Sequence, residues 1–135
     1  MYLDQKVIWI TGASSGIGEA LTLALAHQAQ SVIISARNET ALNAIKERFP
    51  LTQIAVLAFD LLDYENAPAV VEKAISFFGK VDILINNGGI SQRSLIAETD
   101  LQVDKKIMEV DYFGTIALTK ALLPHFIKNH SGHFV

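Results

Sequence analysis

The chain has 135 residues, of which 50% are hydrophobic and 19% are charged, and this composition suits one folded domain rather than a disordered segment. Eleven Lys and Arg against fourteen Asp and Glu give a net charge of -3, and the basic residues are scattered, which argues against nucleic acid as the partner. The absence of cysteine excludes disulfides, thiolate catalysis and cysteine-bound metals, so any redox chemistry requires a cofactor.

The start of the chain bears on its location. Residues 1–6 lack the basic start and the apolar run of a signal peptide, and no run of about 18 uncharged apolar residues occurs anywhere. These features predict a cytoplasmic protein without a membrane span. No metal site is expected, because the four histidines lack metal-ligand spacing.

Short β-branched runs alternate with longer segments of helical periodicity. The expected strands cover residues 6–11, 31–36, 53–58, 82–85 and 132–135. The expected helices cover residues 16–28, 39–49, 66–78 and 101–128. Near-continuous apolar strands are typical of parallel strands that are covered on both faces. The pattern therefore predicts one α/β domain over residues 1–135, with a doubly wound parallel sheet and ligands beyond the carboxyl ends of its strands.

The first expected strand runs into three glycines and then into a helix, in the segment TGASSGIG from Thr11 to Gly18. Glycines at such a junction let the backbone turn tightly and approach a phosphate, while the N–H groups and the positive dipole end of the helix favour an anion. A strand, a glycine turn and a helix in this order form the context of a dinucleotide site. The segment lacks the Gly-Lys-Ser/Thr ending of a P-loop, which argues against an ATPase.

The second expected strand ends at Ala36 and is followed at once by Arg37. In dinucleotide-binding sheets an acidic residue near this position binds the ribose 2′-hydroxyl of NAD, whereas an arginine accommodates the 2′-phosphate of NADP. The planar guanidinium with its several donors suits a phosphate. The sequence therefore favours NADP(H) over NAD(H), with a solvated surface role for Arg37 as the alternative.

Two further motifs follow the third and fourth expected strands: Asp60 with Leu61, and the segment NNGG at residues 86–89. TGASSGIG resembles the TGxxxGIG signature of the short-chain dehydrogenases/reductases, and NNGG resembles the NNAG motif of the same family, with a glycine in place of the alanine. That family places an Asp that binds the adenine ring where Asp60 stands. The resemblance covers the whole chain and implies a Rossmann-type fold.

The resemblance implies an oxidoreductase that transfers a hydride between a nicotinamide cofactor and the carbonyl or alcohol carbon of a small molecule. It assigns Arg37 to the 2′-phosphate and Asp60 with Leu61 to the adenine. The residues implied at the pyrophosphate are Gly12, Ser14, Ser15, Gly16, Ile17 and Gly18, and those implied at the cofactor ribose are Asn87, Gly88 and Gly89. Many NADP-using relatives carry a basic residue where this chain has Ser15.

The last expected helix, over residues 101–128, contains Pro124, which predicts a kink or an end near Leu123. Its apolar side chains are expected to pack mainly in the core, with a surface for a partner helix as the alternative. These apolar positions are Leu101, Ile107, Val110, Leu118, Leu122 and Ile127. Because relatives often associate through this helix, the resemblance implies a homodimer or a homotetramer.

One member of the family's catalytic group is expected within the chain, in altered form. Asp111 stands where the family usually has an Asn that supports a helix kink and a water-linked proton path to the catalytic Lys. An ionised Asp only accepts hydrogen bonds, and its charge favours a protonated Lys. A surface role for Asp111 is the alternative.

The family's catalytic Ser and Tyr-x-x-x-Lys, expected after the fifth strand, are absent from the chain. The pair Tyr2 and Lys6 has the spacing by chance, because it precedes the first strand. The sequence stops at Val135 within an apolar strand, so we expect the front part of a longer chain, with a sheet incomplete at its C-terminal edge. The 135 residues alone are then expected to bind a nucleotide without catalysing hydride transfer.

Two other classes of protein use related architectures. A nonenzymatic nucleotide sensor needs the same glycine turn without a Tyr and Lys pair, and an inactive cofactor-binding fragment would look the same. A methyltransferase normally has an acid after its second strand, so Ala36 and Arg37 argue against it. The fold alone does not decide between these functions.

Overall fold

The structure is a computed structural model that describes residues 3–135. Its strands are β1 (Val7–Thr11), β2 (Ser31–Ser35), β3 (Gln53–Val56), β4 (Ile83–Ile85) and β5 (His133–Phe134). Its longer helices are α1 (Gly16–Leu25), α2 (Glu39–Glu47), α3 (Ala67–Phe78), α4 (Leu101–Ile107), the π-helical η4 (Met108–Gly114) and α5 (Thr115–Lys128). Short 3₁₀ turns are η1 (Leu3–Gln5), η2 (Tyr64–Asn66) and η3 (Ile96–Glu98).

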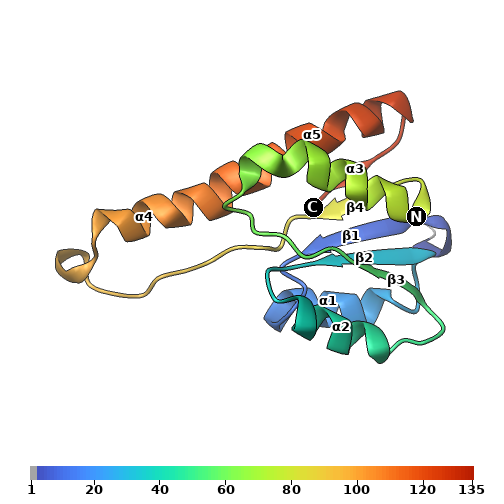
Figure 1. The fold of residues 1–135 in the computed structure, drawn as a ribbon, viewed down its shortest axis with the longest axis horizontal. Helices are drawn as coiled ribbons and strands as arrows, with labels where there is room; N and C mark the ends of the chain where they lie inside the picture. Colours follow the sequence, from blue (N-terminus) through green and yellow to red (C-terminus); the bar gives the residue numbers. More distant parts are fainter. Residues whose placement is uncertain (1–2) are drawn as a thin grey trace.

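All five strands are parallel and lie in the order β3-β2-β1-β4-β5. The chain therefore builds the sheet outward from β1 through β2 to β3. It then crosses back and adds β4 and β5 on the other side of β1. Helices α1 and α2 cover one face of the sheet, while α3 and α5 cover the other (Figure 1). The predicted doubly wound α/β fold is confirmed, and the order reverses between β1 and β4, where such folds bind ligands.

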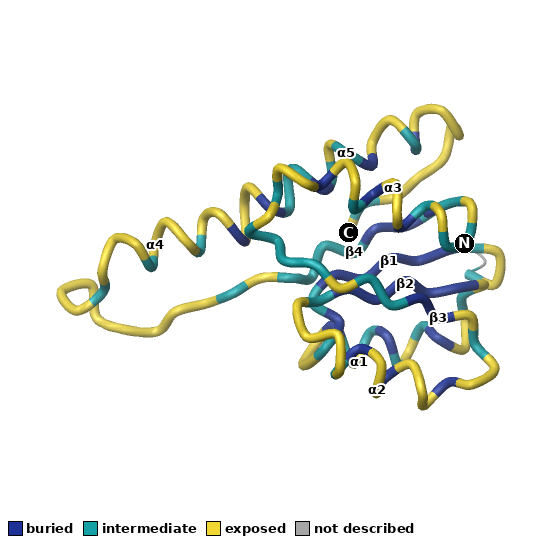
Figure 2. Tube along the Cα trace, in the orientation of Figure 1, coloured by how far each residue is buried: buried dark blue, intermediate teal, exposed yellow. Residues whose placement is uncertain are grey.

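The centre of the sheet is apolar on both faces, as the near-continuous hydrophobic runs predict. Every residue of β1 and β2 is buried (Figure 2). Successive side chains of a strand point to opposite faces. Trp9 therefore packs in the cluster beneath α3 and α5, whereas Ile8 and Ile10 pack in the cluster against α1 and α2.

The last helical segment departs from the prediction in two ways. It is not one α-helix, because the turns from Met108 to Gly114 are π-helical. Of the predicted kink or end near Leu123, the end does not occur: α5 runs through Pro124 to Lys128, and Leu122 and Phe126 on either side of the proline are buried in the core. Of the six apolar positions, Val110, Leu118 and Leu122 are buried and Ile107 is half-buried, but Leu101 and Ile127 are exposed, so the core prediction fails at those two.

Helix α4 and the loop before it extend away from the sheet, and their outer surface is largely exposed (Figures 1 and 2). Within residues 3–135, no helix combines the length and the apolar character that crossing a membrane requires. Strand β5 pairs with β4 and forms one edge of the sheet.

Asp82 ties β1 to β4 at the end of the sheet opposite the glycine turn. Its carboxylate accepts a hydrogen bond of 2.8 Å from the N–H of Val7 and lies 2.9 Å from Nζ of Lys80 and 3.7 Å from Nζ of Lys6. Burial acts to raise the pKa of Asp82, but the hydrogen bond from Val7 and the two lysines outweigh it and lower the pKa below its ordinary value of 3.8.

We expect Asp82→Asn to lower the free energy of unfolding by about 1 kcal/mol at neutral pH, because the amide keeps an acceptor but loses the charge. A carboxyl group whose pKa falls on folding stabilises above its unfolded pKa, and this contribution is lost as the pH falls through the folded-state pKa. Urea unfolding at pH 7 and below pH 4 should therefore show a difference that shrinks on acidification. Asp104→Asn, at an exposed position of α4, is the control, and an equal effect of both variants would contradict this account.

Candidate functional site

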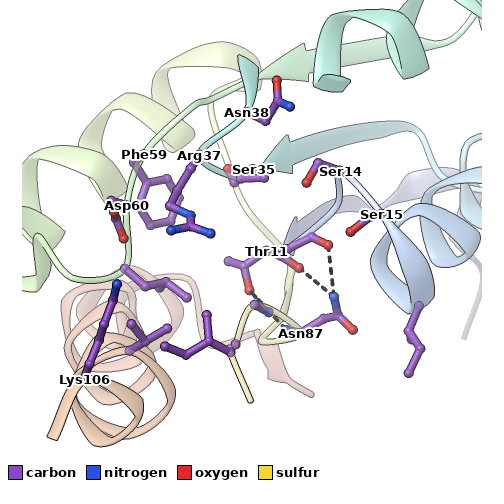
Figure 3. A pocket seen from close by; sticks show the side chains of 18 residues that line it. Thr11, Ser14, Ser15, Ser35, Arg37, Asn38, Phe59, Asp60, Asn87 and Lys106 are labelled. Carbon is purple, nitrogen blue, oxygen red and sulfur yellow. Dashed lines mark hydrogen bonds between the residues drawn. The ribbon is translucent and has the colours of Figure 1, made fainter. Parts of the chain in front are cut away.

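A cleft of about 780 Å³ opens at the carboxyl ends of the strands, where the strand order reverses (Figure 3). Its walls come from the turn after β1, the segments after β2, β3 and β4, and one side of α4 and η4. The residues that line it are Thr11, Gly12, Ser14, Ser15, Ile17, Ser35, Ala36, Arg37, Asn38, Phe59, Asp60, Leu61, Asn87, Gly88, Gly89, Ile90, Lys106 and Val110.

Thr11 and Asn87 join the ends of β1 and β4 at the floor of the cleft. Oγ1 of Thr11 accepts the N–H groups of Asn87 at 3.1 Å and of Gly88 at 2.9 Å. In return, Nδ2 of Asn87 donates to the carbonyl oxygens of Thr11 at 3.1 Å and of Gly12 at 3.3 Å (Figure 3). Four partly buried hydrogen bonds therefore connect the two loops.

The glycine turn brings backbone atoms closer than side chains would permit. A Cβ added to Gly12, whose φ is +64°, would lie 2.7 Å from Cα of Gly88. A Cβ on Gly18 would lie 2.1 Å from the carbonyl oxygen of Gly12. These two glycines let the turn after β1 pack directly against α1 and against the loop after β4. At both positions a side chain would collide with a backbone atom, so the close approach of the backbone requires glycine.

Charged groups stand at one end of the cleft. Arg37 follows β2, Asp60 follows β3, and Lys106 extends from α4 toward the segment that carries Asp60 (Figure 3). Neither Arg37 nor Lys106 forms an ion pair with any residue in the described part of the chain. Oδ1 of Asp60 accepts the N–H of Leu62 at 3.0 Å. The two cations are thus free to meet an anionic or hydrogen-bonding ligand. Residues 3–135 contain no group of three acidic or histidine side chains that could hold a metal ion.

Comparison with known proteins identifies the family of this chain. The family model described as "short chain dehydrogenase" matches residues 6–135. The chain belongs to the short-chain dehydrogenase family. It is 43% identical to "Dehydrogenase/reductase SDR family member 7" of Mus musculus over 98% of this chain and 41% of that protein. It is 44% identical to "Dehydrogenase/reductase SDR family protein 7-like" of Drosophila melanogaster over 97% of this chain and 42% of that protein.

Solved structures of the family share the fold. A short-chain dehydrogenase from Streptomyces avermitilis, 33% identical, superposes with a TM-score of 0.89 over 99% of this chain and 49% of that protein. A 3-ketoacyl-(acyl-carrier-protein) reductase from Brucella melitensis, crystallised with NADH and also 33% identical, gives a TM-score of 0.87 over 94% of this chain and 52% of that protein. The chain thus spans 41% to 42% of the curated relatives named above.

Most of the residues that the family resemblance assigns to the cofactor line this one cleft. Those that line it are Gly12, Ser14, Ser15, Ile17, Arg37, Asp60, Leu61, Asn87, Gly88 and Gly89. Gly16 and Gly18 do not line it: Gly18 packs beneath the turn, and Gly16 supplies a φ of +56° at the start of α1. Asp60 does not close β3, which ends at Val56, although the N–H of Phe59 still donates to the carbonyl of Ala36 at 3.2 Å.

The family motif NNAG places its alanine at Gly88. A Cβ there would lie 2.8 Å from Cδ1 of Leu61, the movable end of a side chain. The glycine in this chain therefore lets Leu61 approach the loop after β4 more closely. On the other side, a Cβ at Gly114 would lie 2.6 Å from the carbonyl oxygen of Leu61, so η4 packs directly on the same segment.

Asp111 lies outside the lining of the cleft but contacts the loop that forms it. Its Oδ1 accepts the N–H of Ile90 at 2.8 Å, and a Cβ on Gly89 would lie 3.1 Å from that oxygen. Asp111 belongs to the π-helical segment η4. The carboxylate of Asp111 thus connects η4 with the loop after β4 through this hydrogen bond. Tyr2, of the chance Tyr2 and Lys6 pair, lies outside the described residues.

Sequence analysis missed several residues of the cleft. They are Thr11, Ser35, Ala36, Asn38, Phe59, Ile90, Lys106 and Val110. Thr11 begins the segment TGASSGIG but has no predicted role, and five others directly precede or follow a residue with a predicted role, so those neighbours could have indicated them. Ser35, one residue farther away, accepts a buried hydrogen bond of 2.8 Å from Nε1 of Trp9. No local signal marks Lys106, which lines the cleft from α4, one helical turn before Val110.

Proposed function

We propose that this chain forms the NADP(H)-binding part of an oxidoreductase that transfers a hydride between nicotinamide and the carbonyl or alcohol carbon of a small molecule. The observation that carries the proposal is Arg37, which stands unpaired among the described residues at the mouth of the cleft, with no acid at the end of β2. An arginine there attracts a 2′-phosphate, whereas an acid would repel it.

The cleft also fits the rest of a dinucleotide. Gly12 and Gly18 allow the β1 turn to come close to a pyrophosphate, and α1 directs its free N–H groups toward the same side. We assign the pyrophosphate to this turn, the adenine to Asp60 and Leu61, and the cofactor ribose to residues 87–89. When bound, nicotinamide supplies the carbon that gives or accepts the hydride. The residues of this chain bind and orient the cofactor.

Binding can be measured through Trp9, the single tryptophan of the chain. Its ring is hydrogen-bonded to Ser35 and lies edge-on to Phe59 with centroids 6.2 Å apart, and both partners line the cleft. Excitation of Trp9 should therefore transfer energy to a bound reduced nicotinamide. We expect NADPH to bind about tenfold more tightly than NADH. Equal affinities would remove the NADP(H) preference, and binding of neither would overturn the proposal.

The second candidate is a nonenzymatic NAD(P) sensor, and Asp111 is the observation that favours it. The family's usual Asn can donate as well as accept, whereas the carboxylate of Asp111 accepts from Ile90 and has no proton to pass on when ionised. Oxidation of NADPH in the presence of carbonyl substrates distinguishes the two functions. Turnover supports the oxidoreductase, and binding of NADPH by the full-length protein without turnover supports the sensor.

A test of Asp111 separates its positioning role from a surface role. Asp111→Ala should speed hydrogen exchange at the Ile90 amide about tenfold, because the hydrogen bond from that N–H to the carboxylate is lost. Asp111→Asn keeps an acceptor and should leave exchange close to that of the unmodified chain. Asp104→Ala, at an exposed position of α4, is the matched control. Unchanged exchange in Asp111→Ala would place the residue on the surface without a positioning role.

We also propose that the chain associates into a homodimer or a homotetramer through residues 101–128. Large apolar side chains on this segment are exposed, among them Leu101, Met108, Tyr112 and Phe113. Contiguous exposed apolar side chains commonly mark protein contacts. A cytoplasmic location likewise stays a prediction from the sequence.

A further inference from the structure

The π-helical segment η4 is buried against the wall of the cleft and not in the core. Its two buried residues are Val110 and Gly114. Val110 lines the cleft, and among the described residues it belongs to neither of the two apolar clusters that pack on the sheet. In α5, by contrast, Leu122 and Phe126 belong to the cluster beneath α3 and α5. Helix α5 is therefore anchored on the sheet, whereas η4 is anchored on the segments that surround the cleft.

Leu61, in the segment after β3, lies between η4 and the loop after β4. A Cβ on Gly114 would lie 2.6 Å from the carbonyl oxygen and 2.9 Å from Cβ of Leu61, so η4 packs closely on the base of this residue. A Cβ on Gly88 would lie 2.8 Å from Cδ1 of Leu61, so the loop after β4 packs on its tip. Leu61 also lines the cleft. A single residue thus adjoins the cleft, the loop after β4 and η4.

Two further contacts join η4 to the same segments. The rings of Phe113 and Tyr64, three residues after Leu61, have centroids 6.1 Å apart. Oδ1 of Asp111 accepts the N–H of Ile90 at 2.8 Å. π-Helical turns are rare and often occur at functional sites, and segments with few buried contacts open more readily than the core. The order of η4 therefore depends on the two segments that also carry residues of the cleft.

We propose that Leu61 is a positioning residue that makes the order of η4, and with it the position of Asp111, depend on the nucleotide in the cleft. A ligand on the cleft side of Leu61 restrains the segment after β3, and the packing of Leu61 on Gly114 passes this restraint to η4. Coupling between two sites is reciprocal, so a displaced η4 weakens nucleotide binding. This inference rests on the proposed cofactor function.

General stabilisation by a ligand makes a different prediction. A ligand that binds only the folded chain slows every amide that exchanges through global unfolding by the same factor. Coupling through Leu61 adds a further slowing in η4, because amides there exchange by local opening. A comparison of η4 with the core helix α5 therefore separates the two effects.

The experiment measures hydrogen exchange at the amides of residues 110–114 in η4 and 125–128 in α5, without ligand and with saturating NADPH. Saturation makes the comparison independent of any change in affinity. The variants are Leu61→Ala and the matched control Leu62→Ala. The two leucines are neighbours and both are half-buried, but only Leu61 lines the cleft and packs on the two glycines. Thermal unfolding checks that each variant keeps its fold.

Gly114→Ala tests the reciprocal direction from a residue that does not line the cleft. Its methyl group would collide with the carbonyl oxygen of Leu61 and displace η4, so NADPH affinity should fall about fivefold. Gly79→Ala, where a Cβ meets no atom within 4 Å, should leave the affinity unchanged. An unchanged affinity in a Gly114→Ala chain that keeps its fold would overturn the inference.

In the unmodified chain we expect NADPH to slow exchange in η4 about tenfold more than in α5. Leu61→Ala should reduce this extra factor to about twofold, and Leu61→Met, which refills the space between the glycines, should restore most of it. Leu62→Ala should keep the full factor. Equal slowing of η4 and α5 in the unmodified chain, or the full factor in Leu61→Ala, would overturn the inference while leaving the proposed function intact. Failure of the unmodified chain to bind NADPH would overturn both.

Discussion

Gly18→Ala should abolish measurable NADPH binding, with a loss of affinity of at least about 100-fold, and should lower the free energy of unfolding by about 3 kcal/mol. A methyl group at this position would lie 2.1 Å from the carbonyl oxygen of Gly12 and 2.5 Å from Nδ2 of Asn87. Neither neighbour is a movable side-chain end, because the first is backbone and the second is held by two hydrogen bonds. Helix α1 must therefore move away from the β1 turn, which separates the two parts of the proposed pyrophosphate site.

Gly79→Ala is the matched control for this variant. Gly79 ends α3 with a φ of +75°, and a Cβ there meets no atom within 4 Å. The substitution should cost about 1 kcal/mol of conformational strain and leave NADPH binding unchanged. Chemical unfolding and the Trp9 signal measure both quantities. If Gly18→Ala binds NADPH like the unmodified chain, the close packing of α1 on the turn is not needed for binding.

Arg37→Glu should weaken NADPH binding about 100-fold while changing NADH binding less than about threefold. The carboxylate would face the 2′-phosphate of NADPH, whereas NADH offers a ribose hydroxyl that a carboxylate can accept from. The two affinities, measured at low and at physiological salt, should both show this split, and the effect on NADPH should be larger at low salt.

Arg93→Glu makes the same change of charge at an exposed loop position that does not line the cleft. It should shift both affinities only slightly and by equal factors. If Arg37→Glu also weakens NADPH and NADH equally, Arg37 acts through the general field of the protein or through the fold, and the assignment to the 2′-phosphate fails.

The sequence predicts those parts of the site that depend on residues close together in the chain. The glycines of the β1 turn are needed by the backbone itself, so their spacing is visible in the sequence and their close contacts appear in the structure. The order of strands and helices follows from hydrophobic periodicity, because strands that are covered on both faces consist mainly of apolar residues. Arg37 is found in the same way, since it directly follows a predicted strand.

Other features depend on contacts between distant segments, and the sequence does not reveal them. Pro124 predicts a helix end by its local chemistry, but the burial of Leu122 and Phe126 overrides that preference. The π-helical segment η4 has no sequence rule of its own, and its position follows from the close packing of Gly114 on Leu61. Lys106 lines the cleft although it lies far along the chain from the segments after β2 and β3, so only the folded chain brings it there.

The two sides of the cleft differ in how firmly they are held. The floor is fixed by the hydrogen bonds between Thr11 and Asn87 at the centre of the sheet, whereas the opposite wall lies on α4, an arm that extends away from the sheet with an exposed outer surface (Figure 2). Segments with few buried contacts open more readily than the core. Substitutions in the floor should therefore act on the equilibrium between folded and unfolded chain, while substitutions on the arm should act on the residence time of the nucleotide.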